Sequence, residues 1–570
     1  MRSHRKYLNF RAILALCSVL GLALPALGAP ALDGLSERRL EGASSTGRAQ
    51  AVRQLTGGHS QPNACLTPRI EGLTTSLGTS TPIQGLLGAL SHRRPSLSER
   101  IRPTNSGVAL RYLPDRGRLP GASHPSIDET LTAVAAALDN TLRLLVDQVG
   151  LAAPRPVEVI LTDLEDVVTG YRAGGSLGRQ RQTDLIVLDR SSPGGSSQIA
   201  RAAAHQMAHQ IAASQHPAIQ GPWAEALAGW VELTLDAAPA MEIQRLLQHR
   251  LNEAGRGLFD ADPELVAGNA LWLAFLAEAQ GAGTVATWLE LTAGLPAGEV
   301  PAGPTRERYD ETLKSRTGLD LAGLLREFHL WSLLTGERSD EHHFSFASSL
   351  TAPAFSHQAD GLPSVSVRND PAVAPFGTAQ VRLRPEFDEG GMRIRFEGSF
   401  EGQWDADLIL VQSNGERRRL PFDLQDGTRG DRTLPLQQIE SAWLLIRNLG
   451  EDSTPQTYTV LAHEEPGFPF ELLSVEAVAT GSGVDIRWET AAEHQMIGFN
   501  LVRRVVGGET TVVVNPVWIP SLGDATHATS YSFFDRGADP DIDYEYRIVG
   551  ITRDALAVRS GFITVLRDRR

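Results

Sequence analysis

The chain has few cysteines, no excess of basic residues and no long apolar run beyond its first 29 residues. Its formal net charge at pH 7 is −14. Nucleic-acid phosphates attract the opposite sign, so we expect no nucleic-acid partner. No later stretch supplies the ~20 consecutive apolar residues of a membrane-spanning helix, so we expect no transmembrane anchor. The hydrophobic content of 42% is ordinary for globular domains.

The first 29 residues predict a secretory signal peptide. An apolar run over 12–24 follows four basic residues, and the small residues of ALGA then offer a cleavage site near Ala29. We therefore expect a secreted protein, whether extracellular, periplasmic or on the cell surface. The bulky Leu16 before Cys17 argues against a lipid attachment site. Cleavage removes Cys17, so Cys65 would have no intrachain disulfide partner.

The length of 570 residues predicts three or more domains, at roughly 100–200 residues each. Composition and periodicity change at several points along the chain. After the signal peptide 1–29, we expect a poorly patterned segment over 30–105, which is either a pro-segment or a linker. A mixed domain follows over 106–350 and a linker over 351–375. Two β modules, over 376–463 and 464–570, complete the expected order.

Residues 106–350 predict an α+β domain. Ser126 and Glu129 form a capping box, and apolar residues then recur at helical spacing up to Gly150. Short strands are expected over 157–161 and 185–188, and mostly helices afterwards.

Beyond the second linker the apolar period changes to two, as in β-strands. We expect a β-sandwich over 376–463 and an immunoglobulin-like sandwich with a buried Trp488 over 464–570. The phrase IRWETAAEHQMIGFNLVRR resembles the fibronectin type III-like modules of secreted bacterial proteins. Such modules usually act as spacers or binding platforms.

The segment HQMAH places His205 and His209 four residues apart, on one face of a helix. Two imidazoles at this spacing can bind one zinc ion. Glu225 follows on a second predicted helix, and two histidines with one glutamate are a known catalytic zinc ligand set. Glu232 shares a face with Glu225 and could orient a ligand imidazole. Gly229, between them, would let this helix approach the histidine helix closely.

These motifs together resemble the gluzincin branch of zinc metallopeptidases: a strand, a helix with the spacing of HExxH, and then a helix that begins PWAEALAGWVE here. The resemblance covers about 106–350 and implies a zincin-like fold with His205, His209 and Glu225 as zinc ligands. In that family a glutamate follows the first histidine and acts as general base on the zinc-bound water. This chain has Gln206 there, and an amide cannot accept that proton.

Two other sets of residues compete for roles at the site. His216 follows His209 by seven residues, whereas the metzincin pattern places its third histidine at six, after a glycine that is Ala212 here. His342, His343 and Tyr309 could face the site as transition-state donors; a solvated loop would explain them equally well.

The sequence therefore predicts a secreted, multidomain zinc metallopeptidase-like protein that carries candidate ligands for Zn²⁺ but lacks its general base. Its partner would be a peptide or a protein. The alternative is a non-catalytic secreted or surface protein that binds through its β modules, with the helical domain as a scaffold. The oligomeric state is left open.

Overall fold

The structure is a computed structural model that describes these residues: 100–112, 126–162, 170–173, 184–190, 194–215, 219, 222–235, 241–296, 298–361, 365–368, 372–386, 390–452, 454–465, 468–524, 527–539 and 541–565. The signal peptide, both cysteines and most of segment 30–105 lie outside these ranges.

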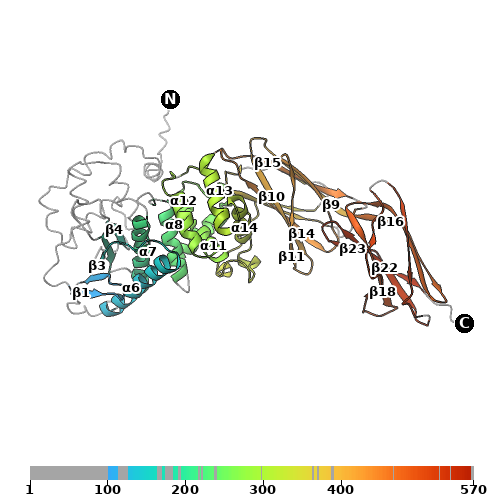
Figure 1. Cartoon of the computed structure of the whole chain (residues 1–570), viewed down its shortest axis with the longest axis horizontal. Helices are drawn as coiled ribbons and strands as arrows, with labels where there is room; N and C mark the ends of the chain where they lie inside the picture. Colours follow the sequence, from blue (N-terminus) through green and yellow to red (C-terminus); the bar gives the residue numbers. More distant parts are fainter. Residues whose placement is uncertain are drawn as a thin grey trace, which may run out of the picture. The chain divides into compact units, whose positions relative to one another are not determined.

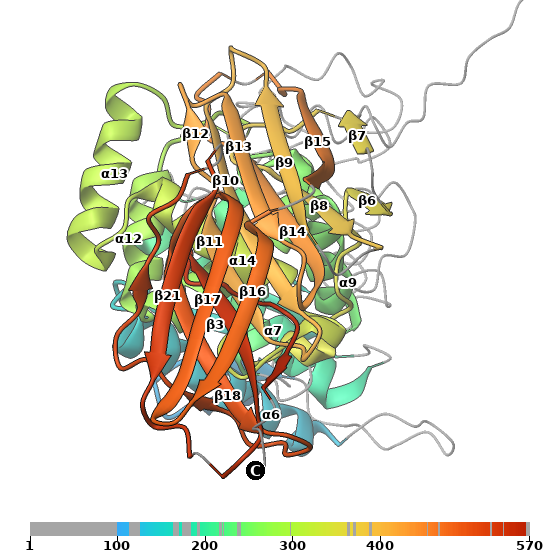
Figure 2. The ribbon, with the colours of Figure 1, turned by 90° about the vertical axis from the view of Figure 1, so that its right-hand side faces the viewer.

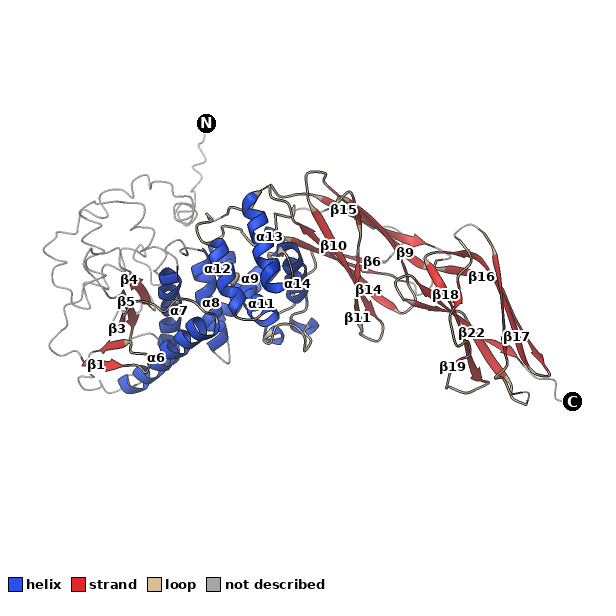
Figure 3. Ribbon diagram, in the orientation of Figure 1, coloured by secondary structure: helices blue, strands red, loops and turns tan. Residues whose placement is uncertain are grey.

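The chain divides into two compact units. One is Met1–Ala354 with Glu451–Ser453, and the other is Phe355–Arg570 without that short stretch. Helices make up most of the first unit, and strands make up nearly all of the second (Figure 3). Of the helices that the structure describes, none combines the length and the apolar character needed to cross a membrane.

The first unit opens with a five-stranded sheet in the order β1-β2-β3-β5-β4. Its strands are β1 (Arg100–Pro103), β2 (Ala109–Tyr112), β3 (Val157–Thr162), β4 (Gly170–Ala173) and β5 (Asp184–Asp189). β2, β3 and β5 run parallel, and the outer strands β1 and β4 run antiparallel to their neighbours. All six residues of β5 are buried, as expected for a central strand rich in valine, isoleucine and leucine.

The start of this sheet differs from the sequence-based expectation. Residues up to 105 were expected to be poorly patterned, yet Arg100–Pro103 pairs in register with Ala109–Tyr112. The exposed side chains of β1 follow no apolar alternation. β1 is therefore defined by its pairing with β2, and its sequence shows no alternation of apolar residues that would predict a strand.

Helix α6 (Ile127–Leu142) begins where the capping box predicted, because the Ser126 hydroxyl accepts a hydrogen bond from the Glu129 backbone at 3.2 Å. The chain continues as a π-helix over Arg143–Gln148 and turns at Gly150, whose φ is +87°. α6 packs against α7 (Gly195–Gln215), which also contacts β4 and β5 (Figure 1). α7 therefore lies between the sheet and the helices beyond it.

The remaining helices form a bundle around an aromatic core. Trp272 and Trp288 lie 5.0 Å apart between ring centroids, and Trp223 lies 5.1 Å from Trp288. The mostly helical structure predicted after the strands is confirmed. The helices after α7 are α8 (Pro222–Leu235), α9 (Met241–Asn252), α10 (Pro263–Gly268), α11 (Ala270–Gln280), α12 (Gly283–Thr292), α13 (Pro304–Thr317) and α14 (Leu321–Leu333).

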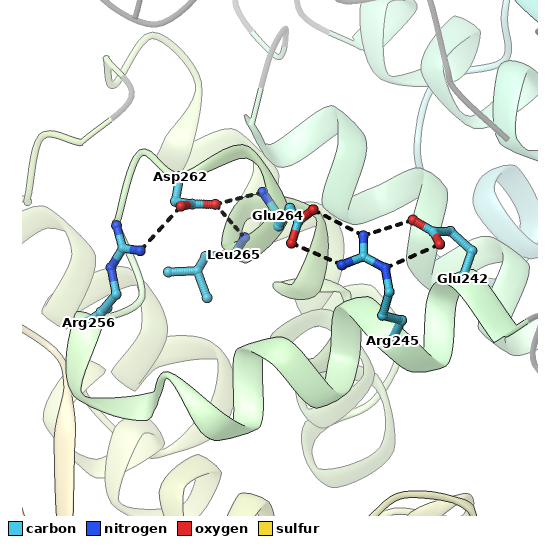
Figure 4. A network of polar contacts seen from close by, with 6 residues as sticks. All are labelled: Glu242, Arg245, Arg256, Asp262, Glu264 and Leu265. Atoms are coloured by element: carbon cyan, nitrogen blue, oxygen red, sulfur yellow. Dashed lines mark hydrogen bonds and ion pairs between the residues drawn. The ribbon is translucent and has the colours of Figure 1, made fainter. Parts of the chain in front are cut away.

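A polar network joins α9 to α10 on the surface of this bundle (Figure 4). Arg245 donates to both Glu242 and Glu264, and these bonds raise the pKa of its guanidinium. Burial raises the pKa of Asp262, but hydrogen bonds from the Glu264 and Leu265 backbone outweigh it and hold that pKa below its usual value. The Asp262 carboxylate thereby caps α10, which packs against α8.

The second unit begins with two five-stranded sheets that enclose one core, here called the first sandwich. Their orders are β11-β10-β14-β8-β6 and β12-β13-β9-β15-β7. The strands expected beyond the second linker are confirmed and include β8, β9, β10 and β14. The strand bounds are β6 (His357–Asp360), β7 (Val365–Arg368), β8 (Thr378–Arg384), β9 (Gly391–Gly398), β10 (Trp404–Gln412), β11 (Arg417–Pro421), β12 (Leu424–Gln425), β13 (Arg429–Pro435), β14 (Ile439–Asn448) and β15 (Tyr458–Glu465).

The predicted linker 351–375 is wrong in part, because strands form at 357–360 and at 365–368. β6 pairs with β8, and β7 pairs with β15, so this stretch supplies one edge strand to each sheet. Edge strands of four residues are too short to show a clear alternation, and the surrounding proline and serine residues have the composition of a linker.

Residues 470–565 form the second sandwich. One sheet has the order β16-β17-β21, and its strands lie side by side in Figure 2. The other has the order β19-β18-β22-β23, with β20 on β18 and β24 on β22. Trp488 is 2% exposed and stacks on Tyr531, which confirms the predicted buried tryptophan. The strands are β16 (Phe470–Thr480), β17 (Gly483–Glu493), β18 (Met496–Val505), β19 (Val512–Val513), β20 (Ile519–Pro520), β21 (Thr529–Asp535), β22 (Tyr544–Thr552), β23 (Ala557–Arg559) and β24 (Ile563–Val565).

Candidate metal centre

Helix α7 presents His205 and His209 one turn apart on the side that faces α8. The helix is rich in buried alanines, so its backbone can approach its neighbours closely. Gln210 attaches α7 to the sheet, because its buried amide donates a hydrogen bond to the carboxylate of Asp184 at the start of β5. α7 is therefore fixed to the sheet one residue beyond His209.

His205, His209 and Glu225 converge on one point. The two Nε2 atoms lie 3.2 Å apart. The Glu225 carboxylate reaches both rings, with Oε1 3.1 Å from His209 Nε2 and Oε2 3.6 Å from His205 Nε2. One ligand atom from each of the three residues lies within 4.8 Å of the others. The side chain of His209 is 1% exposed, and those of His205 and Glu225 are 15% and 20% exposed.

Glu232 lies on the other side of the His205 ring, with Oε1 2.6 Å from Nδ1. A carboxylate accepts hydrogen bonds, so this contact favours the tautomer that carries its proton on Nδ1. In that tautomer the lone pair of Nε2 points at His209 and Glu225. The structure thus brings together four of the five site residues singled out in the sequence.

The fifth residue, Gln206, follows His205 on α7 and is 2% exposed. Its side chain is an amide, which donates and accepts hydrogen bonds but has no titratable proton near neutral pH.

Gly229 has a different role from the expected one. A Cβ atom there would lie 2.9 Å from Ile243 Cδ1 of α9 and 3.3 Å from Ala270 Cβ of α11. The glycine therefore permits close packing of α8 on α9 and α11, and not on the histidine helix. The expectation was wrong because Glu225, Gly229 and Glu232 share a helix face only approximately. Gly229 can therefore contact different neighbouring helices from the two glutamates. Trp223 and Trp230 of α8 are buried.

The competing donor residues are engaged elsewhere. Tyr309 is fully buried, its hydroxyl donates to the Leu291 carbonyl at 3.0 Å, and burial raises its pKa. His343 Nδ1 lies 2.5 Å from Asp340 Oδ1, and the neighbouring His342 is exposed. Tyr309 is thus a core residue and not a donor facing the site. His216 lies outside the described residues.

Asp184 and Gln210 hold the histidine helix against β5, and the sequence did not single them out. Their 26-residue separation gives no local signal. A glutamine on the buried side of an alanine-rich helix was the one available clue, because a buried amide needs a hydrogen-bond partner.

The donor set suits a divalent transition metal. Two imidazoles and one carboxylate are a ligand set of zinc. Three ligand atoms about 2.1 Å from one ion at tetrahedral angles lie roughly 3.4 Å apart. The two Nε2 atoms lie 3.2 Å apart, and each faces a different oxygen of Glu225, at 3.1 Å for His209 and 3.6 Å for His205. The residues present therefore fit such an ion.

Comparison with known proteins finds only weak likenesses to this chain. No protein-family model and no curated protein matches it. Among solved structures, it is similar to an Fn3-like protein from Clostridium thermocellum, with 17% identity over 18% of this chain and 94% of that chain and a TM-score of 0.13.

Two further structures are similar at the same low level. A two-domain fibronectin type III segment of chicken tenascin has 15% identity over 35% of this chain and 98% of that chain, with a TM-score of 0.15. The adhesin domain of Epf from Streptococcus pyogenes has 12% identity over 36% and 78%, with a TM-score of 0.14. Sequence identities and TM-scores this low do not support a fold assignment, so the sandwich architecture is inferred from the sheets described above.

Proposed function

We propose that this chain is a secreted zinc metallopeptidase-like protein of the gluzincin type whose catalysis is impaired. His205, His209 and Glu225 hold the metal, and Glu232 orients His205. Gln206 occupies the position of the general base. The partner is a peptide or a protein, and the signal peptide directs the chain out of the cytoplasm.

The observation that carries this proposal is the convergence of the three donors from two helices. Unprotonated Nε2 atoms and a carboxylate repel one another at about 3 Å, so their approach is favourable only with a cation or a proton between them. Glu232 holds the Nδ1 proton of His205, which leaves its Nε2 lone pair available to a metal.

Zinc in such a site acts as a Lewis acid and lowers the pKa of a water that it binds. The residues of this chain then limit the rate of hydrolysis. Gln206 can hold a water by hydrogen bonds, but its amide cannot take the proton that a glutamate would take. General-base catalysis typically contributes about 10²–10⁴-fold, so peptide hydrolysis is slowed by a factor of this order.

Metal content tests the proposal directly. Protein purified after zinc supplementation should contain about one zinc ion per chain, whereas Glu225→Ala should contain almost none, because two histidines alone leave the ligand set incomplete. The control is Glu242→Ala on α9, which removes an exposed carboxylate paired with Arg245. Zinc-free wild type after supplementation, or equal zinc in all three proteins, would refute the metal site.

Glu232→Gln should weaken zinc affinity without abolishing binding. The amide still reaches Nδ1 of His205, but it no longer offers the negative charge that makes the ligand ring more basic. Loss of such an outer partner typically costs about 10–100-fold in metal affinity. Competition with a chromophoric chelator measures the change. An affinity equal to that of the wild type would show that Glu232 does not act through His205.

A second candidate function is a non-catalytic protein that binds through its β sandwiches. Gln206 favours it, because a peptidase under selection for turnover would need its base. Zinc content distinguishes the two candidate functions. A wild-type protein that takes up no zinc would indicate that the helical unit is a scaffold and that the β sandwiches carry the function.

A further inference from the structure

The outer face of one sheet in the second sandwich carries a cluster of arginines in an acidic protein. Tyr546 and Ile548 of β22 point into the core, so the residues between and beside them point outward. Arg547 is one of these, and strand pairing places Arg504 opposite Glu545 and Arg559 opposite Val549. Arg504, Arg547, Arg559 and Phe562 are here called the arginine face.

The positive charge of the arginine face is incompletely balanced. Arg504 pairs with Glu545 at 2.5 Å. The side chain of Arg547 forms no hydrogen bond or ion pair with any residue in the described ranges, and its Nε is buried without a partner there. Burial, with the neighbouring charges of Arg559 and Arg504, lowers the pKa of Arg547. Within the described part of the chain, three guanidinium groups thus share one carboxylate.

The guanidinium groups of Arg504 and Arg547 and the backbone of Arg559 are also held in place before any ligand arrives. Arg504 and Arg547 both lie over the ring of Phe562, at 3.9 and 4.6 Å from its centroid. The backbone of Arg559 exchanges two hydrogen bonds with the Gln437 side chain, at 2.7 and 3.1 Å. Fixed side chains lose less conformational entropy on binding, which favours recognition.

We propose that the arginine face binds a ligand that carries phosphate or sulfate groups, with Arg547 as the central contact. Arginine offers several N–H donors in a planar arrangement that matches tetrahedral oxyanions. An anion here would offset the mutual repulsion of three cations and accept the hydrogen bonds that Arg547 leaves unused. The site is independent of the metal centre and belongs to a different unit of the chain.

The first test is calorimetric titration of the full chain with inorganic tripolyphosphate at low ionic strength. Arg547→Gln and Arg559→Gln should each weaken binding about tenfold or more, since hydrogen bonds to charged groups contribute at least that much. Arg487→Gln is the matched control, because Arg487 is an exposed arginine of β17 that pairs with Asp485. Its affinity should equal that of the wild type.

Glu545→Gln should increase the affinity for tripolyphosphate, and a misfolded variant would not show such an increase. It removes the only carboxylate paired with Arg504 among the described residues, so tripolyphosphate should bind several-fold more tightly. No binding to the wild type, or equal affinities for Arg547→Gln and Arg487→Gln, would overturn the proposal.

The source of the oxyanion is decided by two further probes. Phosphatidylcholine vesicles with and without phosphatidic acid test a lipid headgroup, and dextran sulfate against plain dextran tests a soluble polymer. Retention by the anionic member of either pair, lost in Arg547→Gln, supports the proposal and identifies the source. Retention by neither overturns it.

Discussion

Gln206→Glu is expected to raise peptide hydrolysis by about 10²–10⁴-fold over the wild type in the presence of zinc. The substitution restores a carboxylate next to His205, where a general base can take a proton from water, and leaves the size of the side chain almost unchanged. A library of quenched fluorescent peptides would measure the rate, because the substrate sequence is unknown.

A double variant separates restored catalysis from contamination. Gln206→Glu combined with His209→Ala should lose the gained activity, because it removes one of the converging donors. Gln206→Glu should also be less stable than the wild type without zinc, since it places a carboxylate at a position that is 2% exposed. A zinc-loaded Gln206→Glu variant with no hydrolysis would show that more than the base has been lost.

Arg447→Met is expected to destabilise the second unit by about 3–5 kcal/mol, the usual cost of breaking a buried ion pair from one side. Arg447 is fully buried on β14, lies 2.9 Å from Asp405 across the strand pair and also bonds Asp407. Removing it takes their shared arginine from two largely buried carboxylates, while Arg419 still lies 2.8 Å from Asp407. Urea unfolding followed by β-sheet circular dichroism measures the loss.

Arg395→Met is the matched control for this prediction. Arg395 is 52% exposed and lies 3.5 Å from Asp431, so its removal should change stability by about 1 kcal/mol or less. Arg447→Met with Asp407→Asn should recover part of the loss, because one uncompensated charge is gone. Equal stability of the two single variants would contradict the assigned role of Arg447.

Much of the fold was predictable because its signals are local. The capping serine, the apolar spacing of α6 and the period-two strands are properties of consecutive residues, and each appears where it was expected. The failures share a cause. Strands β1, β6 and β7 have four residues each, so they are defined by a partner strand and not by their own pattern.

The amino-acid sequence by itself determined that His205 and His209 share one helix face and that Gln206 replaces a glutamate, because a helix fixes the geometry of residues four apart. Only the tertiary structure decided that Glu225 meets both histidines, that Glu232 reaches His205, that Gly229 faces α9 and that Tyr309 is buried. It also assembled the arginine face from three strands and a loop. Such contacts depend on how helices and strands pack together. Packing depends on the shapes of surfaces that residues from several segments form jointly, so no single segment predicts it.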